Sequence, residues 1–93
     1  MGTSEKAKDF VYTGPLAFPM SCFLQDMRLS GRIYNAEGNL LRRIDEMSGA
    51  MNCPENCLTR ELVEQWTYKR EYESHKTWAN RTIVIRQLAR YMN

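Results

Sequence analysis

The C-terminal stretch of the chain has cations and amides along one side of a predicted helix, and no carboxylate beside them. At 3.6 residues per turn, the side chains on this line are Lys76, Asn80, Ile83, Gln87 and Arg90. Lysine and arginine bind phosphate oxygens, and asparagine and glutamine amides pair with base edges, above all those of adenine. A solvated helix face is the alternative, because cations also favour the C-terminal half of any helix through its dipole. The composition of this line alone leaves both interpretations open.

The opposite side of the same helix is apolar and is expected to face the core. Its residues are Trp78, Thr82, Ile85, Leu88, Ala89 and Met92. Arg81 lies at the edge of this apolar side. Two roles are open for Arg81: an ion pair with a carboxylate such as Glu61 or Glu64, or a contact with DNA.

The charge of the chain is unevenly distributed. The 93 residues have a formal net charge of +2, which by itself predicts no partner. Up to Glu73 there are nine lysines and arginines against eleven aspartates and glutamates, whereas from Ser74 onward there are four cations and no anion. The C-terminal fifth is therefore the basic part of the chain.

Four amphipathic helices are predicted to position these side chains, and no segment has the alternation of a strand. The first covers Phe18 to Ile33, and the second is capped by Asn35 and has its apolar stripe between Leu40 and Met47. A loop follows from Ser48 to Cys57. These elements predict an all-α fold, a compact four-helix bundle.

The third and fourth helices have stronger start signals. Thr59 is the predicted cap of the third helix, with Leu58 and Val63 at the spacing of a hydrophobic staple. A polar hinge from Glu71 leads to Ser74, the predicted cap of the fourth helix, which runs to the end of the chain.

Length and composition indicate one small globular domain. Residues 1–14 are expected to be a flexible lead-in, with Tyr12 to Leu16 packing back on the domain. There is no apolar run long enough for a membrane span and no secretion signal, so we expect a cytoplasmic protein without a membrane partner. The odd number of cysteines argues against a disulfide framework.

Cofactor and metal chemistry find little support in the sequence. A zinc site would need Cys22, Cys53, Cys57 and His75 to converge from three separate elements, so we expect no metal. There is no glycine-rich phosphate loop and no nucleophile with a neighbouring base, so we expect no cofactor and no catalytic residue.

The run LTRELVEQWTYKREYESHKTWANRTIVIRQLARYM, Leu58 to Met92, resembles the second half of the core-binding domain of tyrosine recombinases of the phage integrase type. The matching positions are Leu58, Thr59, Trp66, Glu73, Ser74, Thr77, Arg81, Ile85, Arg86, Gln87, Ala89, Arg90 and Tyr91. Leu88 departs from the family pattern, which has an aromatic residue there. Upstream, SGRIY and LLRRIDEM are similar to the family's Gly-x-x-Tyr turn and Leu-Arg-x-Phe-Asp helix, so that the resemblance covers about residues 15–93.

The resemblance implies a SAM-like core-binding domain over residues 15–93, an orthogonal bundle that forms one jaw of a clamp around double-stranded DNA. Strand cleavage and exchange belong to a separate C-terminal domain, expected to be absent from this chain, and other recombinase protomers would be partners through the full-length protein. This part of the enzyme would bind DNA without cutting it. Tyr91, in the closing motif of the last helix, is expected to pack at the helix end and not to act as a nucleophile.

The resemblance and the basic line together give the expected DNA contacts. On the fourth helix, Lys76 and Arg90 would bind phosphates, and Thr77, Asn80 and Gln87 would bind base edges or adjoining phosphates. The contacts expected from the second helix and the turn before it are Arg32, Asn39, Arg42 and Arg43. The alternative function is a small protein–protein interaction module, which the apolar Ile83 on the outer line would favour.

Overall fold

The computed structural model describes residues 10–32 and 34–92, and within them the chain folds into four helices and no strand. The helices are α1 (Ala17–Leu29), α2 (Asn35–Ala50), α3 (Arg60–Thr67) and α4 (His75–Met92). The predicted all-α architecture is therefore confirmed. None of these helices has both the length and the apolar character that crossing a membrane requires.

α1 ends earlier than the sequence predicted. The prediction extended it to Ile33, which lies outside the described residues, whereas the helix stops at Leu29. Gly31 has a φ of +94°, a left-handed conformation that glycine adopts without a steric penalty. Its N–H donates to the carbonyl of Arg28 at 3.0 Å, so the chain turns away instead of continuing the helix.

The predicted cap of α2 is wrong. Asn35 is the first helical residue, and the position before it is Tyr34, whose φ of 59° is left-handed and whose side chain caps nothing. The Asn35 side-chain oxygen instead accepts a hydrogen bond from Nη2 of Arg28 at 3.0 Å. The amide therefore links the start of α2 to the end of α1.

The loop after α2 is also shorter than predicted, because the helix continues to Ala50. Ser48, expected to begin the loop, is fully buried, and its hydroxyl donates to the Asp45 carbonyl at 2.6 Å. A serine that bonds the backbone of its own helix does not interrupt that helix.

The predicted caps of α3 and α4 are confirmed. The Thr59 hydroxyl accepts from the backbone N–H of Leu62 at 3.1 Å. The Ser74 hydroxyl likewise accepts from the N–H of Thr77 at 3.1 Å. In each case a side chain satisfies an N–H group that has no carbonyl partner within the helix.

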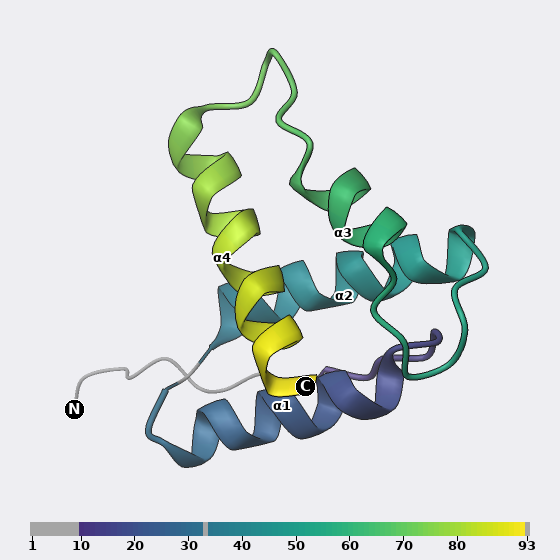
Figure 1. The fold of residues 1–93 in the computed structure, drawn as a ribbon. Coiled ribbons are helices and arrows are strands. Elements are labelled where there is room, and N and C mark those ends of the chain that lie inside the picture. Colours follow the sequence, from purple (N-terminus) through teal and green to yellow (C-terminus); the bar gives the residue numbers. More distant parts are fainter. Residues whose placement is uncertain (1–9, 33, 93) are drawn as a thin grey trace.

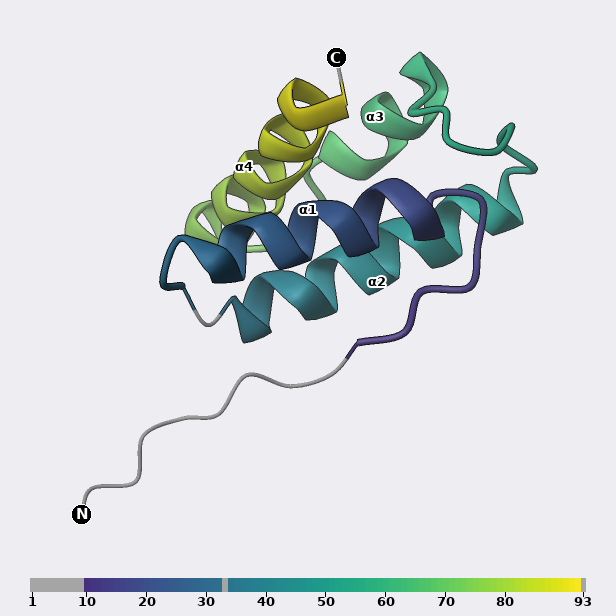
Figure 2. The same cartoon turned by 90° about the horizontal axis from the view of Figure 1, so that it is seen from below.

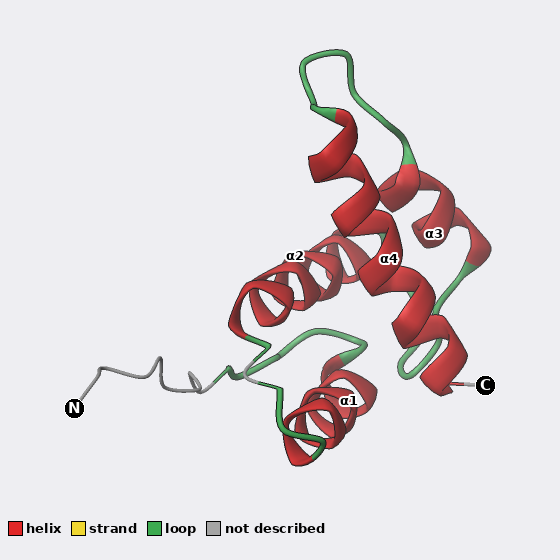
Figure 3. Cartoon of the chain, turned by 90° about the vertical axis from the view of Figure 1, so that its left-hand side faces the viewer, coloured by secondary structure: helices red, strands yellow, loops and turns green. Residues whose placement is uncertain are grey.

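α4 crosses α2 and packs against both α1 and α3, as Figure 1 shows. α1 and α2 lie side by side (Figure 2), and the loop between α3 and α4 projects beyond the helices (Figure 3). The core fills the space between the four helices. Its fully or almost fully buried side chains include Leu16, Met20, Phe23, Leu41, Ile44, Leu62, Trp66, Ile85 and Leu88.

The predicted apolar side of α4 is largely the buried side. Thr82, Ile85 and Leu88 are buried, while Trp78, Ala89 and Met92 are half-buried. Two further residues, Arg81 and Val84, are buried on this helix, so the face that packs on the domain is wider than the apolar stripe.

The described part of the N-terminal lead-in packs on α2; residues 1–9 lie outside the described residues. The buried phenol of Tyr12 donates to the carbonyl of Gly38 at 3.2 Å. The carboxylate of Asp45 accepts from the N–H groups of Gly14 at 2.7 Å and of Leu16 at 3.0 Å. A Cβ at Gly14 would lie 2.9 Å from the Asp45 carbonyl oxygen, so this approach requires glycine.

Candidate nucleic-acid interface

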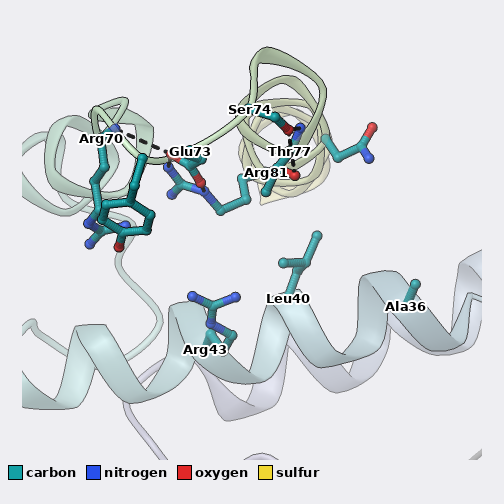
Figure 4. Close-up of a pocket in the computed structure, with 10 residues that line it drawn as sticks. Ala36, Leu40, Arg43, Arg70, Glu73, Ser74, Thr77 and Arg81 are labelled. Atoms are coloured by element: carbon teal, nitrogen blue, oxygen red, sulfur yellow. Dashed lines mark hydrogen bonds and ion pairs between the residues drawn. The ribbon is translucent and has the colours of Figure 1, made fainter.

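A concave groove of about 620 Å³ separates the middle of α2 from the start of α4 (Figure 4). Ala36, Leu40 and Arg43 point into it from α2, and Thr77 faces them from α4. Its other lining residues are Arg70, Tyr72, Glu73, Ser74, Asn80 and Arg81. We call this the α2–α4 groove.

Two further depressions continue the groove along α4. One of about 230 Å³ shares Asn80 with the α2–α4 groove and reaches Arg32 and Gln87. The next, of about 400 Å³, shares Arg32 and Gln87 and reaches Arg90 near the end of the helix. The three depressions follow one another along α4 and share lining residues, and we call this row of depressions the basic track.

Six of the nine predicted DNA contacts line the basic track: Arg32, Arg43, Thr77, Asn80, Gln87 and Arg90. They come from the turn before α2, from α2 and from the whole length of α4. The helix crossing therefore brings together side chains that are up to 58 positions apart in the sequence.

The other three predicted contacts do not line the track. Lys76 and Asn39 are exposed and lie one helical turn before Asn80 and Arg43, on the same helix faces. Arg42 is exposed but lies about 100° around α2 from Arg43. Burial raises the pKa of the Tyr12 phenol to about 12. Arg42 is close enough to this phenol for its charge to act in the opposite direction, although the effect of burial is larger. Arg42 thus belongs to the side of α2 that carries the N-terminal segment.

Arg43 is held over an aromatic ring. Its guanidinium carbon lies 5.8 Å from the ring centroid of the buried Trp66, a cation–π distance. The Trp66 indole N–H donates to the Arg81 carbonyl at 2.9 Å, which fixes the ring between α3 and α4. This arrangement orients the Arg43 charge toward the groove while leaving the side chain exposed.

Arg81 has a structural role in the wall of the groove, with only 3% of the residue exposed. Its Nε donates to Oε2 of Glu73 at 2.6 Å and its Nη2 to Oε1 of Glu73 at 2.7 Å. The guanidinium also donates to the carbonyls of Trp66 and Tyr68. The pairing predicted with Glu61 or Glu64 is wrong, because the hinge brings Glu73 to Arg81 instead. The hydrogen bond from Arg81 is the largest cause of a lowered Glu73 pKa.

The two amides on α4 differ in what they can still bind. The Gln87 oxygen accepts from the Tyr34 phenol at 2.7 Å, which uses one of the two lone pairs of that oxygen and leaves the NH₂ group without a partner in that bond. This bond ties the Gln87 amide to the turn before α2, so the amide is held in one orientation for a base edge or a phosphate. The Asn80 side chain is exposed and makes no hydrogen bond with the described residues, so both the oxygen and the NH₂ of its amide are available.

The chain matches no family model, no curated protein and no solved structure.

Sequence reasoning missed Arg70 and Tyr72, which line the α2–α4 groove from the α3–α4 loop. The run Tyr68 to Tyr72, YKREY, has an aromatic residue at each end and two adjacent cations inside it, a combination found in nucleic-acid contacts. That signal was available in the sequence, but a hinge between two helices gives no indication of which face its side chains meet.

Tyr91 packs at the end of α4 as expected, with its ring centroid 5.3 Å from that of Phe23. Burial and the neighbouring Asp26 carboxylate raise its pKa.

The three cysteines do not line the basic track and form no disulfide bond with one another. Cys22, Cys53 and Cys57 are all free thiols, with Cys22 on α1 and the other two in the loop after α2. Within residues 10–32 and 34–92, no three His, Cys, Asp or Glu side chains are grouped so that they could hold a metal ion.

Proposed function

We propose that this chain binds double-stranded DNA along the basic track, as the SAM-like core-binding domain of a site-specific tyrosine recombinase. The observation that supports this most strongly is that six predicted contacts, from α4, α2 and the turn before it, line three neighbouring depressions. The recombinase assignment itself rests on the sequence resemblance over residues 15–93.

The chemistry of the track suits a duplex. Arg43, Arg32 and Arg90 are exposed cations spread along it, and each could bind a phosphate of the DNA backbone. Asn80 lies in the middle with both amide groups available and would read a base edge in the major groove, which is wide enough to admit a helix. The arginines would fix the position of the protein on the DNA backbone, and the Asn80 amide would give the preference for a base sequence.

Salt dependence tests the proposal directly. If four to six cations bind phosphates, the logarithm of the binding constant should fall with the logarithm of salt concentration at a slope of about −4 to −5. Arg43→Gln should lower this slope in magnitude by about 1 and weaken binding to every duplex. Binding that ignored salt would count against the proposal.

Arg60 provides a matched control. It is an exposed arginine on α3 that pairs with Glu64 at 3.2 Å and does not line the track. Arg60→Gln removes the same formal charge as Arg43→Gln, so equal losses in the two variants would indicate a nonspecific charge effect. Loss confined to Arg43→Gln supports a localised interface.

A protein-interaction module remains the second candidate, and Ile83 favours it. This apolar side chain is 50% exposed on the outer line of α4, and it lines the depression shared with Asn80 and Gln87. Chemical shifts around Ile83 that change with protein concentration and not with added DNA would support this candidate.

The recombinase assignment has a separate test. A natural gene product in which this domain is followed by an arginine, a His-x-x-Arg motif and a tyrosine nucleophile would support it. A different C-terminal partner domain would leave DNA binding intact and remove the recombinase assignment.

A further inference from the structure

Tyr72 is the most exposed large apolar side chain among the described residues, at 84%. It is the third residue of the turn Arg70–Glu73, which closes with the Glu73 N–H donating to the Arg70 carbonyl at 3.1 Å. This turn lies in the loop that projects between α3 and α4 (Figure 3). An aromatic ring in this position loses the burial that usually stabilises such a side chain.

The turn that carries Tyr72 is held in place by its neighbours. The Glu73 carboxylate accepts from the Arg70 N–H at 3.3 Å and is bound at two points by the buried Arg81 (Figure 4). The Lys69 ammonium donates to the Glu73 carbonyl at 2.9 Å. Because the backbone of this turn is already ordered, a ligand that binds the ring loses little affinity to the conformational entropy of the loop.

Tyr72 also shares a groove with cations. It lines the α2–α4 groove together with Arg43 and Arg70, while the Glu73 charge is neutralised by Arg81. A strand whose phosphate binds Arg43 or Arg70 would therefore bring an adjoining base close to the phenol ring. Stacking on an aromatic ring next to cations is how proteins bind unpaired bases of any sequence.

We infer that Tyr72 is a stacking site for an unpaired DNA base at the loop end of the α2–α4 groove. The inference rests on the proposed function, because the groove has to hold a DNA strand for the ring to meet a base. In an intact duplex both faces of each base are covered by neighbouring bases, so the ring can accept a base only where the strand is gapped, frayed or unpaired. The protein should therefore prefer a duplex that contains a short single-stranded gap.

Tyr68 provides a matched control within the same loop. It is also highly exposed, at 71%, but it lines a different depression, which holds Glu61 and Glu64 as well as Arg70. The two carboxylates outnumber the one arginine there and repel phosphates, so we expect a DNA strand bound to the α2–α4 groove not to reach this ring.

The experiment compares two end-labelled duplexes, identical except for a short gap in one strand, by fluorescence anisotropy at low salt. Tyr72→Ala should weaken binding to the gapped duplex about tenfold, the loss expected for one stacked base, and change binding to the intact duplex less than about twofold. Tyr72→Phe keeps the ring and should bind as the unchanged protein does. Tyr68→Ala should alter neither affinity.

A fluorescent adenine analogue in the gap gives a readout specific to stacking. Its emission should fall when the protein binds, and Tyr72→Ala should abolish that fall. Equal affinity for gapped and intact duplexes, or an equal loss on both with Tyr72→Ala, would overturn the stacking site. If Arg43→Gln still weakens duplex binding in that case, the proposed function stands; if neither duplex binds at all, both proposals fail together.

Discussion

Arg81 and Glu73 form a two-point ion pair inside the protein, with N–O distances of 2.6 and 2.7 Å and side-chain exposures of 3% and 8%. The pair joins the middle of α4 to the loop before it, and the same guanidinium binds the carbonyls of Trp66 and Tyr68 at the end of α3. One side chain therefore holds together the wall of the groove and the turn that presents Tyr72.

Replacing Arg81 should be among the most destabilising single changes in this chain. Arg81→Met takes the guanidinium from the Trp66 and Tyr68 carbonyls and removes two of the hydrogen bonds to the Glu73 carboxylate. A buried polar group left without its partner costs about 1–3 kcal/mol, and we expect a loss of at least this size in the free energy of unfolding measured with denaturant. Arg60→Met, which breaks the exposed pair with Glu64, should cost less than about 0.5 kcal/mol. Similar costs for both variants would contradict the structural role of Arg81.

The same pair should make stability depend on acid. Arg81 lowers the pKa of Glu73 from its ordinary 4.5 in the folded state, so the pair stabilises the protein fully above pH 4.5. This contribution is lost as the pH falls below that value and through the lowered pKa. Glu73→Gln should be less stable than the unchanged protein at pH 7, and the difference should shrink in acid. Urea unfolding between pH 7 and pH 2 measures the difference in free energy of unfolding between the two proteins. If this difference did not change with pH, the Glu73 charge would have no stabilising role.

Tyr12 should make stability depend on alkali. Burial raises the pKa of its phenol from 10.0 to about 12, so the folded state favours the protonated form. The resulting stabilisation is present below pH 10 and is lost as the pH rises from 10 toward 12. Tyr12→Phe should lower the free energy of unfolding at pH 7 by about 1 kcal/mol, because it removes the hydrogen bond to Gly38. Above pH 10 the decline in stability should be shallower in this variant than in the unchanged protein.

Glu37 should oppose DNA binding. It lines the depression that contains Arg32 and Asn80, where its charge repels a phosphate. Glu37→Gln should tighten binding to duplex DNA roughly two- to fivefold at low salt, and the gain should shrink as salt is added. Glu46→Gln, an exposed carboxylate of α2 that does not line the track, should leave the affinity unchanged. Equal gains from both variants would show that only net charge matters.

The features that local sequence could predict are those that depend on near neighbours. Thr59 and Ser74 were identified as caps because a hydroxyl two to three residues before a helical N–H can bind it whatever the rest of the chain does. Asn35 failed as a cap because its side chain had a competing partner, Arg28, in another helix. The ends of α1 at Leu29 and of α2 at Ala50 were also predicted incorrectly. They depend on the backbone conformation of Gly31 and on the hydrogen bond of Ser48 within its own helix, neither of which follows from helix propensity.

The sequence by itself determined four amphipathic helices, the caps of the last two and the row of cations and amides on α4, because hydrophobic periodicity and capping act over a few residues. Tertiary structure decided which cations share a surface: the crossing of α2 and α4 places Arg43 and Asn80 in one groove, whereas Arg42 lies near enough to Tyr12 to affect its pKa. It also assigned Arg81 to Glu73 and the Gln87 oxygen to Tyr34. These pairings follow from how the helices pack around one core, and residues far apart in sequence carry no local signal of that packing.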